Sequence, residues 1–400
     1  MNLSQVATVV PVRALTSGPE HHFFGYYDKD QWDPGGRYIL GMQTPFCGRP
    51  VAATDICLIG MIDLEGAREF QPLAETTAWC WQQGCMLQWM PGADSKIIYN
   101  HRIGDRFVAV IQDVTTGEKQ TLPRPIYSVS GDGKWALSLN FSRLAVKRPG
   151  YGYEGLPDGW GDDAAPEQDG VYVMEIETGN HHLLVDLAEL AARDPTEIMR
   201  VGIHEVNHLL FNPSATRFIF LHRWTDPARI VGTRMYTVNL DGTGRHLVPI
   251  DDASHFIWSS DDEILVWAET AAGHHYYLCR DLSSEVSIFA DGVLTDNGHC
   301  TVSPDRRWVL TDEYPDAERY CPLILYRIAD DTRFTLGRFY SMPELTGVTR
   351  CDLHPRWSRD GKTICFDSSH EGSRQMYIAD VSAIVALEPG EFPPDGGFRS

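Results

Sequence analysis

One short pattern recurs seven times along the chain: a polar turn followed by an apolar or aromatic run. The last copy reads CDLHPRWSRDGKTICFDS at 351–368, where Ser-Arg-Asp-Gly separates two strand-like runs. Asp-Gly between alternating runs is a strong signal for a β-hairpin. Equivalent turns begin at residues 33, 91, 130, 212, 259 and 303, and each precedes a run such as RYILGM, KIIYN or RWVLTD. A unit that recurs this often indicates a repeat architecture.

A second hairpin follows each of these units, for example at 57–73, 107–123 and 235–250. The pattern therefore predicts an all-β fold, a seven-bladed β-propeller with four-stranded antiparallel blades around a central channel. We expect a single domain over 1–400, with the N-terminal run 5–14 closing the ring against the last blade. The expected blades lie near 20–75, 76–124, 125–188, 200–250, 251–291, 295–340 and 349–390.

Composition limits the partners. The net charge of −21 argues against nucleic-acid binding, which needs a basic surface. Nine scattered cysteines, several of them inside strand patterns, are typical of reduced thiols and favour the cytoplasm. The N-terminus shows neither a signal-peptide pattern nor a membrane span, so we expect a cytoplasmic location, or a periplasmic one if a leader has been removed. The oligomeric state stays open.

Four histidines share one place in the repeat. His208, His255, His299 and His354 each lie four residues before the first residue of a turn, although the chain has only 15 histidines. Equivalent positions on the innermost strands converge on the channel, so we expect an imidazole cluster near one mouth. Such a cluster suits a divalent metal or proton transfer near neutral pH. Cys351 is a further candidate ligand for the metal. The alternative is that the repeat reuses a polar residue against channel water.

Other candidates lie where strands enter or leave the same rim. The connection at 141–169 is unusually long and begins basic and aromatic, which is typical of a functional loop, although a plain insertion is the alternative. The candidates for substrate contact are His22, Tyr26, Gln83, Arg148, Tyr151 and Tyr153. The candidates for chemistry include Tyr127, Arg143, His101 and Arg234.

This inventory favours elimination over hydrolysis. No pair of opposed carboxylates stands out for glycoside hydrolysis, and the sequence has no Gly-x-Ser-x-Gly elbow or phosphate-binding loop. Elimination from a uronic acid needs a cation to neutralise the carboxylate, a base and an acid. Arginine, histidine and tyrosine side chains supply all three roles.

Several short blocks resemble seven-bladed polysaccharide lyases of the oligogalacturonate, ulvan and rhamnose–glucuronate types. The blocks are HHFFGYYDK, FSRL followed by RPGYGY, NGHCTVSPDRRWVLTDEYP and CDLHPRWSRDGK. The resemblance implies two rival catalytic pairs. In the oligogalacturonate type an arginine and a histidine act as carboxylate clamp and base, and Arg234 and His255 match them. In the ulvan type a tyrosine acts as acid or base and an arginine sixteen residues later neutralises the carboxylate, and Tyr127 and Arg143 match them.

The resemblance also implies a metal held by histidines of the last two blades. His299 and His354 match, whereas the run Cys351-Asp-Leu-His354-Pro-Arg356 departs from the Gln-x-x-His-x-His of that family. The expected cofactor is a divalent cation, Mn²⁺, Zn²⁺ or Ca²⁺, with no organic cofactor.

We therefore interpret the chain as a lyase that cleaves uronic-acid-containing oligosaccharides by β-elimination. Arg143 would neutralise the carboxylate, Tyr127 would act as acid or base, and His101, His208 or His255 would complete the proton transfer. The alternatives are a propeller that binds carbohydrate or protein without catalysis, and a propeller glycoside hydrolase.

Overall fold

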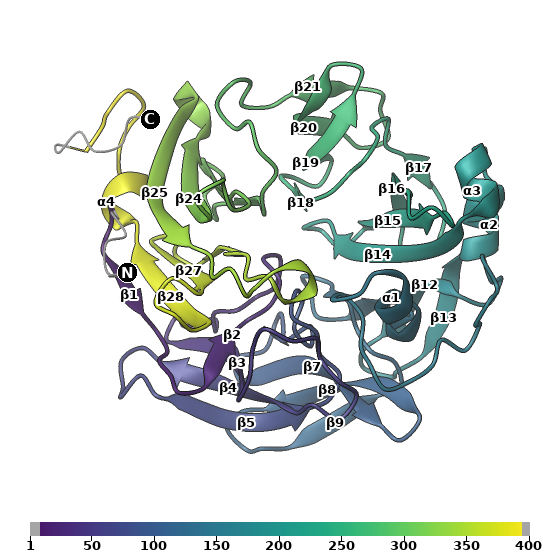
Figure 1. Cartoon of the computed structure of the whole chain (residues 1–400), viewed down its shortest axis with the longest axis horizontal. Coiled ribbons are helices and arrows are strands. Elements are labelled where there is room, and N and C mark those ends of the chain that lie inside the picture. Colours follow the sequence, from purple (N-terminus) through teal and green to yellow (C-terminus); the bar gives the residue numbers. More distant parts are fainter. Residues whose placement is uncertain (1–8, 394–400) are drawn as a thin grey trace.

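The computed structural model describes residues 9–393 and forms a ring of seven four-stranded antiparallel sheets (Figure 1). This confirms the predicted seven-bladed β-propeller. Blade one contains β2 (His21–Phe23), β3 (Tyr38–Thr44), β4 (Cys57–Asp63) and β5 (Phe70–Thr76), and blade two contains β6 (Gln88–Trp89), β7 (Lys96–Ile103), β8 (Arg106–Asp113) and β9 (Lys119–Leu122). Blade three contains β10 (Ser128–Val129), β11 (Trp135–Ser138), β12 (Gly170–Glu175) and β13 (His181–Asp186). Blade four contains β14 (Ile203–Phe211), β15 (Arg217–Thr225), β16 (Val231–Asn239) and β17 (His246–Leu247).

The remaining blades complete the ring. Blade five contains β18 (Phe256–Trp258), β19 (Glu263–Thr270), β20 (Gly273–Arg280) and β21 (Val286–Ile288). Blade six contains β22 (Thr301–Val302), β23 (Trp308–Asp312), β24 (Tyr320–Arg327) and β25 (Thr332–Tyr340). Blade seven contains β26 (Arg356–Trp357), β27 (Thr363–Ser368), β28 (Gln375–Asp380) and β1 (Val12–Ala14). Within the described residues the helices are short: α1 (Phe141–Lys147), α2 (Leu187–Ala192), α3 (Glu197–Val201), α4 (Ser382–Val385), η1 (Ile328–Asp330) and η2 (Gly347–Thr349). None of these helices has the length and hydropathy that crossing a membrane requires.

The recurring turns share one side-chain device. In three blades a serine accepts a hydrogen bond from the amide that begins the next strand and donates to an aspartate two residues ahead. The three pairs are Ser130 with Asp132, Ser303 with Asp305 and Ser358 with Asp360. Short polar side chains that bond to nearby amides fix tight turns. The turn sequence therefore sets the register of the first hairpin in each of these blades.

Apolar side chains fill the spaces between neighbouring blades. One cluster joins blades one and two, another runs through blades two to four, and others continue to blades five, six and seven. The cluster of Leu15, Trp32, Ile39, Met376 and Ile378 lies between the last blade and the first. Because every blade buries both faces in this way, its strands are apolar on both sides near the middle.

The ring is closed by pairing between the two ends of the chain. β1 lies antiparallel to β28, with Arg13 opposite Ile378, so the outermost strand of blade seven comes from the N-terminus (Figure 1). The pairing covers an edge that would otherwise be exposed. Residues 5–8 of the expected closing run lie outside the described residues.

The long connection after β11 is not simply a loop. Its first residues form α1, which begins after Asn140, whose side chain accepts hydrogen bonds from the amides of Ser142 and Arg143. Asparagine is a favoured residue at this position because it satisfies amides that have no partner within the helix. The expectation of a basic loop from residue 141 was therefore wrong for 141–147, and this changes where the side chains of the segment point.

Removal of β1 should destabilise the ring. A chain that begins at Ser17 leaves the backbone of β28, a strand buried along most of its length, without a partner on one side. We expect a lower midpoint of thermal unfolding and a tendency to associate through the exposed edge. Differential scanning fluorimetry and size-exclusion chromatography would measure both effects, with a chain that begins at Val9 as the control. Equal stability of the two chains would contradict this account of closure.

Candidate functional site

The segment between β2 and β3 enters the central channel and carries Tyr26 and Tyr27 to its axis. The ring of Tyr26 lies 5.1 Å from that of His208 and 5.2 Å from that of His354, between centroids. The hydroxyl of Tyr27 donates a hydrogen bond to the carbonyl of Phe256 and lies 3.5 Å from His208 Nε2. The axis is therefore filled by aromatic side chains that contact several blades at once.

The four histidines of the repeat meet around these tyrosines. The centroid distance is 4.1 Å between His255 and His299 and 4.2 Å between His299 and His354, while the rings of His208 and Tyr27 lie 5.8 Å apart. Burial, with the nearby cations, lowers the pKa of His208, His255 and His354 well below the usual range. These three imidazoles are therefore neutral at physiological pH, each with one donor and one acceptor nitrogen.

The backbone at two of these histidines is left-handed, with φ of +50° at His208 and +41° at His354. Met86, which occupies the equivalent position in the second blade, has φ of +56°. The conformation therefore belongs to the way the inner strands enter the blades and is not a mark of chemistry. At His208 it coincides with a bulge between Asn207 and Leu210.

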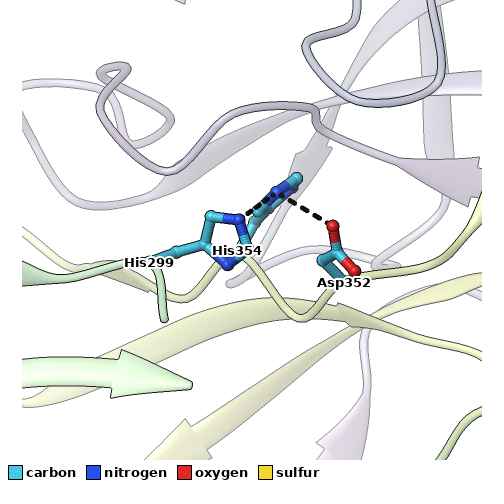
Figure 2. A group of neighbouring side chains, drawn as sticks. All are labelled: His299, Asp352 and His354. Atoms are coloured by element: carbon cyan, nitrogen blue, oxygen red, sulfur yellow. Dashed lines mark hydrogen bonds and ion pairs between the residues drawn. The ribbon is translucent and has the colours of Figure 1, made fainter. Parts of the chain in front are cut away.

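Two histidines and a carboxylate have the arrangement of metal ligands (Figure 2). His354 Nε2 lies 3.2 Å from His299 Nε2 and 3.8 Å from an oxygen of Asp352. Ligands that share one ion at ~2.1 Å stand roughly 3–3.5 Å apart, so these separations fit a common cation after a small adjustment. Asp312 accepts a hydrogen bond from His299 Nδ1 at 2.8 Å, which directs Nε2 toward the group. His354 Nδ1 is buried without a hydrogen-bond partner.

Cys351 does not belong to this group. Its thiol is buried, and burial raises the pKa of the thiol to about 12. Its sulfur is not among the ligand atoms that lie within 4.8 Å of one another. The neighbouring residue, Asp352, supplies the third candidate ligand instead. Asp352 and Asp312 were not expected from the sequence, because the candidate ligands there were the repeated histidines and Cys351.

A second group lies across the mouth of the channel from blade three to blade seven. Arg350, on the connection before β26, donates a hydrogen bond of 2.7 Å to the hydroxyl of Tyr151, and Arg148 lies 4.6 Å from the centre of the same ring. In Figure 1 this yellow-green connection runs over the middle of the ring toward α1. Arg350 also pairs with Asp352 at 2.6 Å, which links this group to the candidate metal ligands.

The two cations change the chemistry of Tyr151. Burial by itself would raise the pKa of the phenol, but Arg350 and Arg148 outweigh it, so the pKa of Tyr151 is lowered. Burial likewise opposes the charge of Arg350, yet Asp352 and Tyr151 raise its pKa. Tyr151 is therefore placed to exist as a phenolate more readily than an ordinary tyrosine.

Tyr127 and Gln83 lie deeper in the same region. Gln83 donates a hydrogen bond of 2.6 Å to the hydroxyl of Tyr127, and the ring of Tyr127 is 6.4 Å from that of His208. Burial raises the pKa of Tyr127 well above its usual value. Tyr127 is therefore a hydroxyl donor in this environment rather than a base.

The guanidinium groups of Arg143 and Arg234 form their hydrogen bonds away from the histidine cluster. Arg143 is 2% exposed, pairs with Asp158 at 2.9 Å and donates to the carbonyls of 163, 164 and 204. Arg234 donates to the carbonyls of residues 193 and 194, just after α2. The expected approach of these two arginines to the histidine cluster is absent from the contacts of residues 9–393.

Three further candidates lie away from the axis. His101 is 3.3 Å from the hydroxyl of Thr76, and His22 lies 2.9 Å from the amide oxygen of Gln375. Tyr153 is fully buried, with its ring stacked 4.2 Å from Phe141. Their contacts are those of packing residues between blades, which the spacing of the sequence could not distinguish from rim residues.

The opposite mouth of the channel has a different character. A cavity of about 440 Å³ lies where the inner strands end, with Trp32, Trp258 and Trp357 among its lining residues. Tyr27 lines it too and so separates it from the histidine cluster. The groups suited to acid–base chemistry therefore gather at the end where the inner strands begin.

Two solved oligogalacturonate lyases share this fold over nearly the whole chain. One, from Vibrio parahaemolyticus, has a TM-score of 0.66 and 14% identity, with 94% of this chain and 96% of that chain covered. The other, in complex with manganese, has a TM-score of 0.66 and 16% identity, with 94% of each chain covered. This confirms the resemblance predicted from the sequence at the level of the fold, which is what such identities show.

A structure from a study of prolyl endopeptidases also matches, with a TM-score of 0.51 and 8% identity, covering 91% of this chain and 47% of that chain. No family model and no curated protein matches the chain.

The candidate ligand group predicts binding of a divalent cation. His354→Ala and Asp352→Asn should each lower the bound Mn²⁺ or Zn²⁺ by at least about tenfold, the loss typical even of groups that only support ligands. Metal content after dialysis, measured by mass spectrometry, and the shift of the thermal midpoint on adding Mn²⁺ would test this. Cys351→Ser is the matched control and should bind as the wild type does. Loss of metal only in Cys351→Ser would overturn the assignment.

Proposed function

We propose that the protein is a lyase that cleaves uronic-acid-containing oligosaccharides by β-elimination. The observation that carries the proposal is Tyr151, whose hydroxyl is bound by Arg350 and whose ring lies beneath Arg148. A phenol with a lowered pKa between two guanidinium groups combines a base with the cations that a uronate carboxylate needs. The likeness to oligogalacturonate lyases supports the same reaction class.

In this proposal Arg148 and Arg350 bind the carboxylate of the sugar. Arg148 is available because its Nε has no hydrogen-bond partner although it is buried. Neutralising the carboxylate makes the proton on the adjacent carbon more acidic, because the negative charge that develops in the transition state is stabilised. Arg148 and Arg350 thus replace Arg143 in the role that the sequence analysis gave to Arg143.

Tyr151 then removes that proton as its phenolate. The bond between the next carbon and the glycosidic oxygen breaks, a carbon–carbon double bond forms, and the leaving oxygen receives a proton. We assign this second transfer to His208 or His255, whose neutral imidazoles lie among the axial rings and each retain one N–H donor. Tyr127, with its raised pKa and its bond to Gln83, is assigned to support Tyr151 rather than to replace it.

A divalent cation is part of the proposal. His299, Asp352 and His354 would hold it, and two imidazoles with one carboxylate suit Mn²⁺ or Zn²⁺. One of the similar structures is a manganese complex, which favours Mn²⁺. When bound, such a cation would supply Lewis-acid stabilisation of a carboxylate oxygen.

Substitution of Tyr151 tests the reaction. With digalacturonate or a glucuronate-containing oligomer, the wild type should produce a rise in ultraviolet absorbance from the unsaturated uronide. Tyr151→Phe should lower kcat/KM by at least ~10²-fold, the usual contribution of a general base. Tyr320→Phe, which changes a tyrosine on β24 whose ring meets that of Tyr340 edge to face, is the matched control and should retain activity.

The products separate the alternatives. Hydrolysis would add water to the mass of the products, whereas elimination would not. Oligouronide binding without any absorbance rise would favour a non-catalytic propeller. Full activity in Tyr151→Phe together with loss in Tyr127→Phe would restore the pair expected from the sequence.

The pH dependence of the reaction should follow Tyr151. Because the phenolate is the base, kcat should rise with pH until Tyr151 is deprotonated. Arg350→Met removes a cation that lowers the pKa of Tyr151, so the rising limb of the pH profile of kcat should move to higher pH. Measured pH profiles of kcat for the two proteins would show the shift. A limb that stays in place in Arg350→Met would contradict the role of Tyr151 as base.

A further inference from the structure

Glu205 is a buried carboxylate that the proposed reaction does not use. It lies on β14, is 3% exposed, and its Oε2 has no hydrogen-bond partner among the described residues. A buried carboxylate oxygen without a partner is costly when it is charged. The position therefore needs an explanation in terms of a ligand, a proton or both.

The nearest cations on the neighbouring strand do not neutralise Glu205 by direct contact. Arg223 of β15 stands opposite Glu205 in the strand register, but its guanidinium donates to Asn207 at 3.2 Å, Thr233 at 2.8 Å and the carbonyl of Ala253 at 3.1 Å. No ion pair within 4.0 Å joins Glu205 to Arg223 in the described structure. Arg223 therefore stabilises the ionised form of Glu205 by electrostatic attraction at a distance, without a direct ion pair.

Arg148 is the complementary group on the other side. It ends α1, which packs against β14, and its Nε is as unpartnered as Oε2 of Glu205. Arg148 nevertheless makes no ion pair with Glu205 within 4.0 Å among residues 9–393. Among the cations that stabilise the Glu205 carboxylate, the largest contribution thus comes from Arg148, the guanidinium that we assign to the substrate carboxylate.

The charges around Glu205 are nearly all positive. Those acting on it come from α1 and its C-terminal end and from β15, while α2, which also packs on β14, directs its Glu189 to Arg245. Burial raises the pKa of Glu205 to about 7, and the cations oppose this rise. The cations are Arg148, Arg223, Arg143 and Lys147.

We propose that Glu205 takes up a proton when a uronate carboxylate binds at Arg148, and so makes the affinity of the site for anionic sugars depend on pH. This rests on the proposed placement of the uronate. An anion on Arg148 cancels the positive field at Glu205 and adds a negative charge nearby, and both effects favour the protonated form. The proton comes from the solvent, and no other bond changes.

Linkage gives the sign and the size of the effect. Free Glu205 is largely ionised above pH 7, so binding there requires uptake of up to one proton. Affinity should then fall by up to about tenfold for each unit of pH above 7. Below that pH Glu205 is already protonated, and affinity should level off. An uncharged ester of the same sugar should show neither effect.

Calorimetry of sugar binding to the full chain tests this inference. Sodium galacturonate and sodium glucuronate, with their methyl esters as uncharged controls, would be titrated at pH 6 to 9 in buffers of different ionisation enthalpy. We expect Glu205→Gln to take up close to one proton fewer than the wild type above pH 7, because any uptake by Tyr151, which faces the same cations, is common to both proteins. Glu263→Gln, which removes a carboxylate at the start of β19 in blade five, is the matched control and should take up protons as the wild type does.

The outcomes distinguish this inference from the proposed function. Equal proton uptake in the wild type and Glu205→Gln would assign the proton to another group and overturn the inference, as would binding without uptake or no binding of either uronate. Uronate binding with uptake lost in Glu205→Gln, but without any turnover of oligomers, would support the inference while the lyase proposal failed. Turnover of oligomers without proton uptake on binding would support the lyase proposal and overturn the inference about Glu205.

Discussion

Desolvation at the propeller axis is the constraint on which the rest of the site depends. Seven inner strands converge there, so polar side chains at their starts are removed from water together. Each charged group in such a place must be paired or neutralised. Asp28 with Lys29, Asp312 with His299 and Asp352 with Arg350 satisfy this requirement by direct contact. Among the atoms left without hydrogen-bond partners, His354 Nδ1, Arg148 Nε and Glu205 Oε2 belong to the residues that we assign to the metal, the uronate and the proton.

Desolvation also sets the protonation states of the histidine and tyrosine side chains at the axis. Burial keeps His208, His255 and His354 neutral and keeps Tyr127 protonated, because the low-dielectric axis disfavours charge. Only Tyr151, between two guanidinium groups, is shifted the other way. A site with one activated phenol and several neutral imidazoles can move a proton in two directions without a second carboxylate. The proposed elimination therefore does not require the two opposed carboxylates that glycoside hydrolysis uses.

The ring and the meeting of the four histidines followed from the sequence because both depend on spacing. Turn residues such as Ser358 and Asp360 are local in their action, and equivalent positions of a repeat must share an axis once the ring closes. The individual roles did not follow, because they depend on side-chain direction. Asn140 begins a helix, and that helix turns Arg143 inward to Asp158, whereas Arg148 at its end faces the channel mouth. Periodicity cannot separate two arginines five residues apart in a segment whose helix was not expected.

The carboxylates were missed for a related reason. Asp352 lies two residues before His354, and Asp312 ends a strand of the preceding blade, so neither stands in the repeated histidine column. Glu205 lies three residues before His208, but the bulge at Asn207 breaks the alternation that would have assigned it a face. The acidic groups therefore come from positions outside the histidine column. If one position of the repeat supplies the imidazoles and other positions supply the carboxylates, metal binding and proton uptake would arise from changes of side chain within blades whose common frame is left intact.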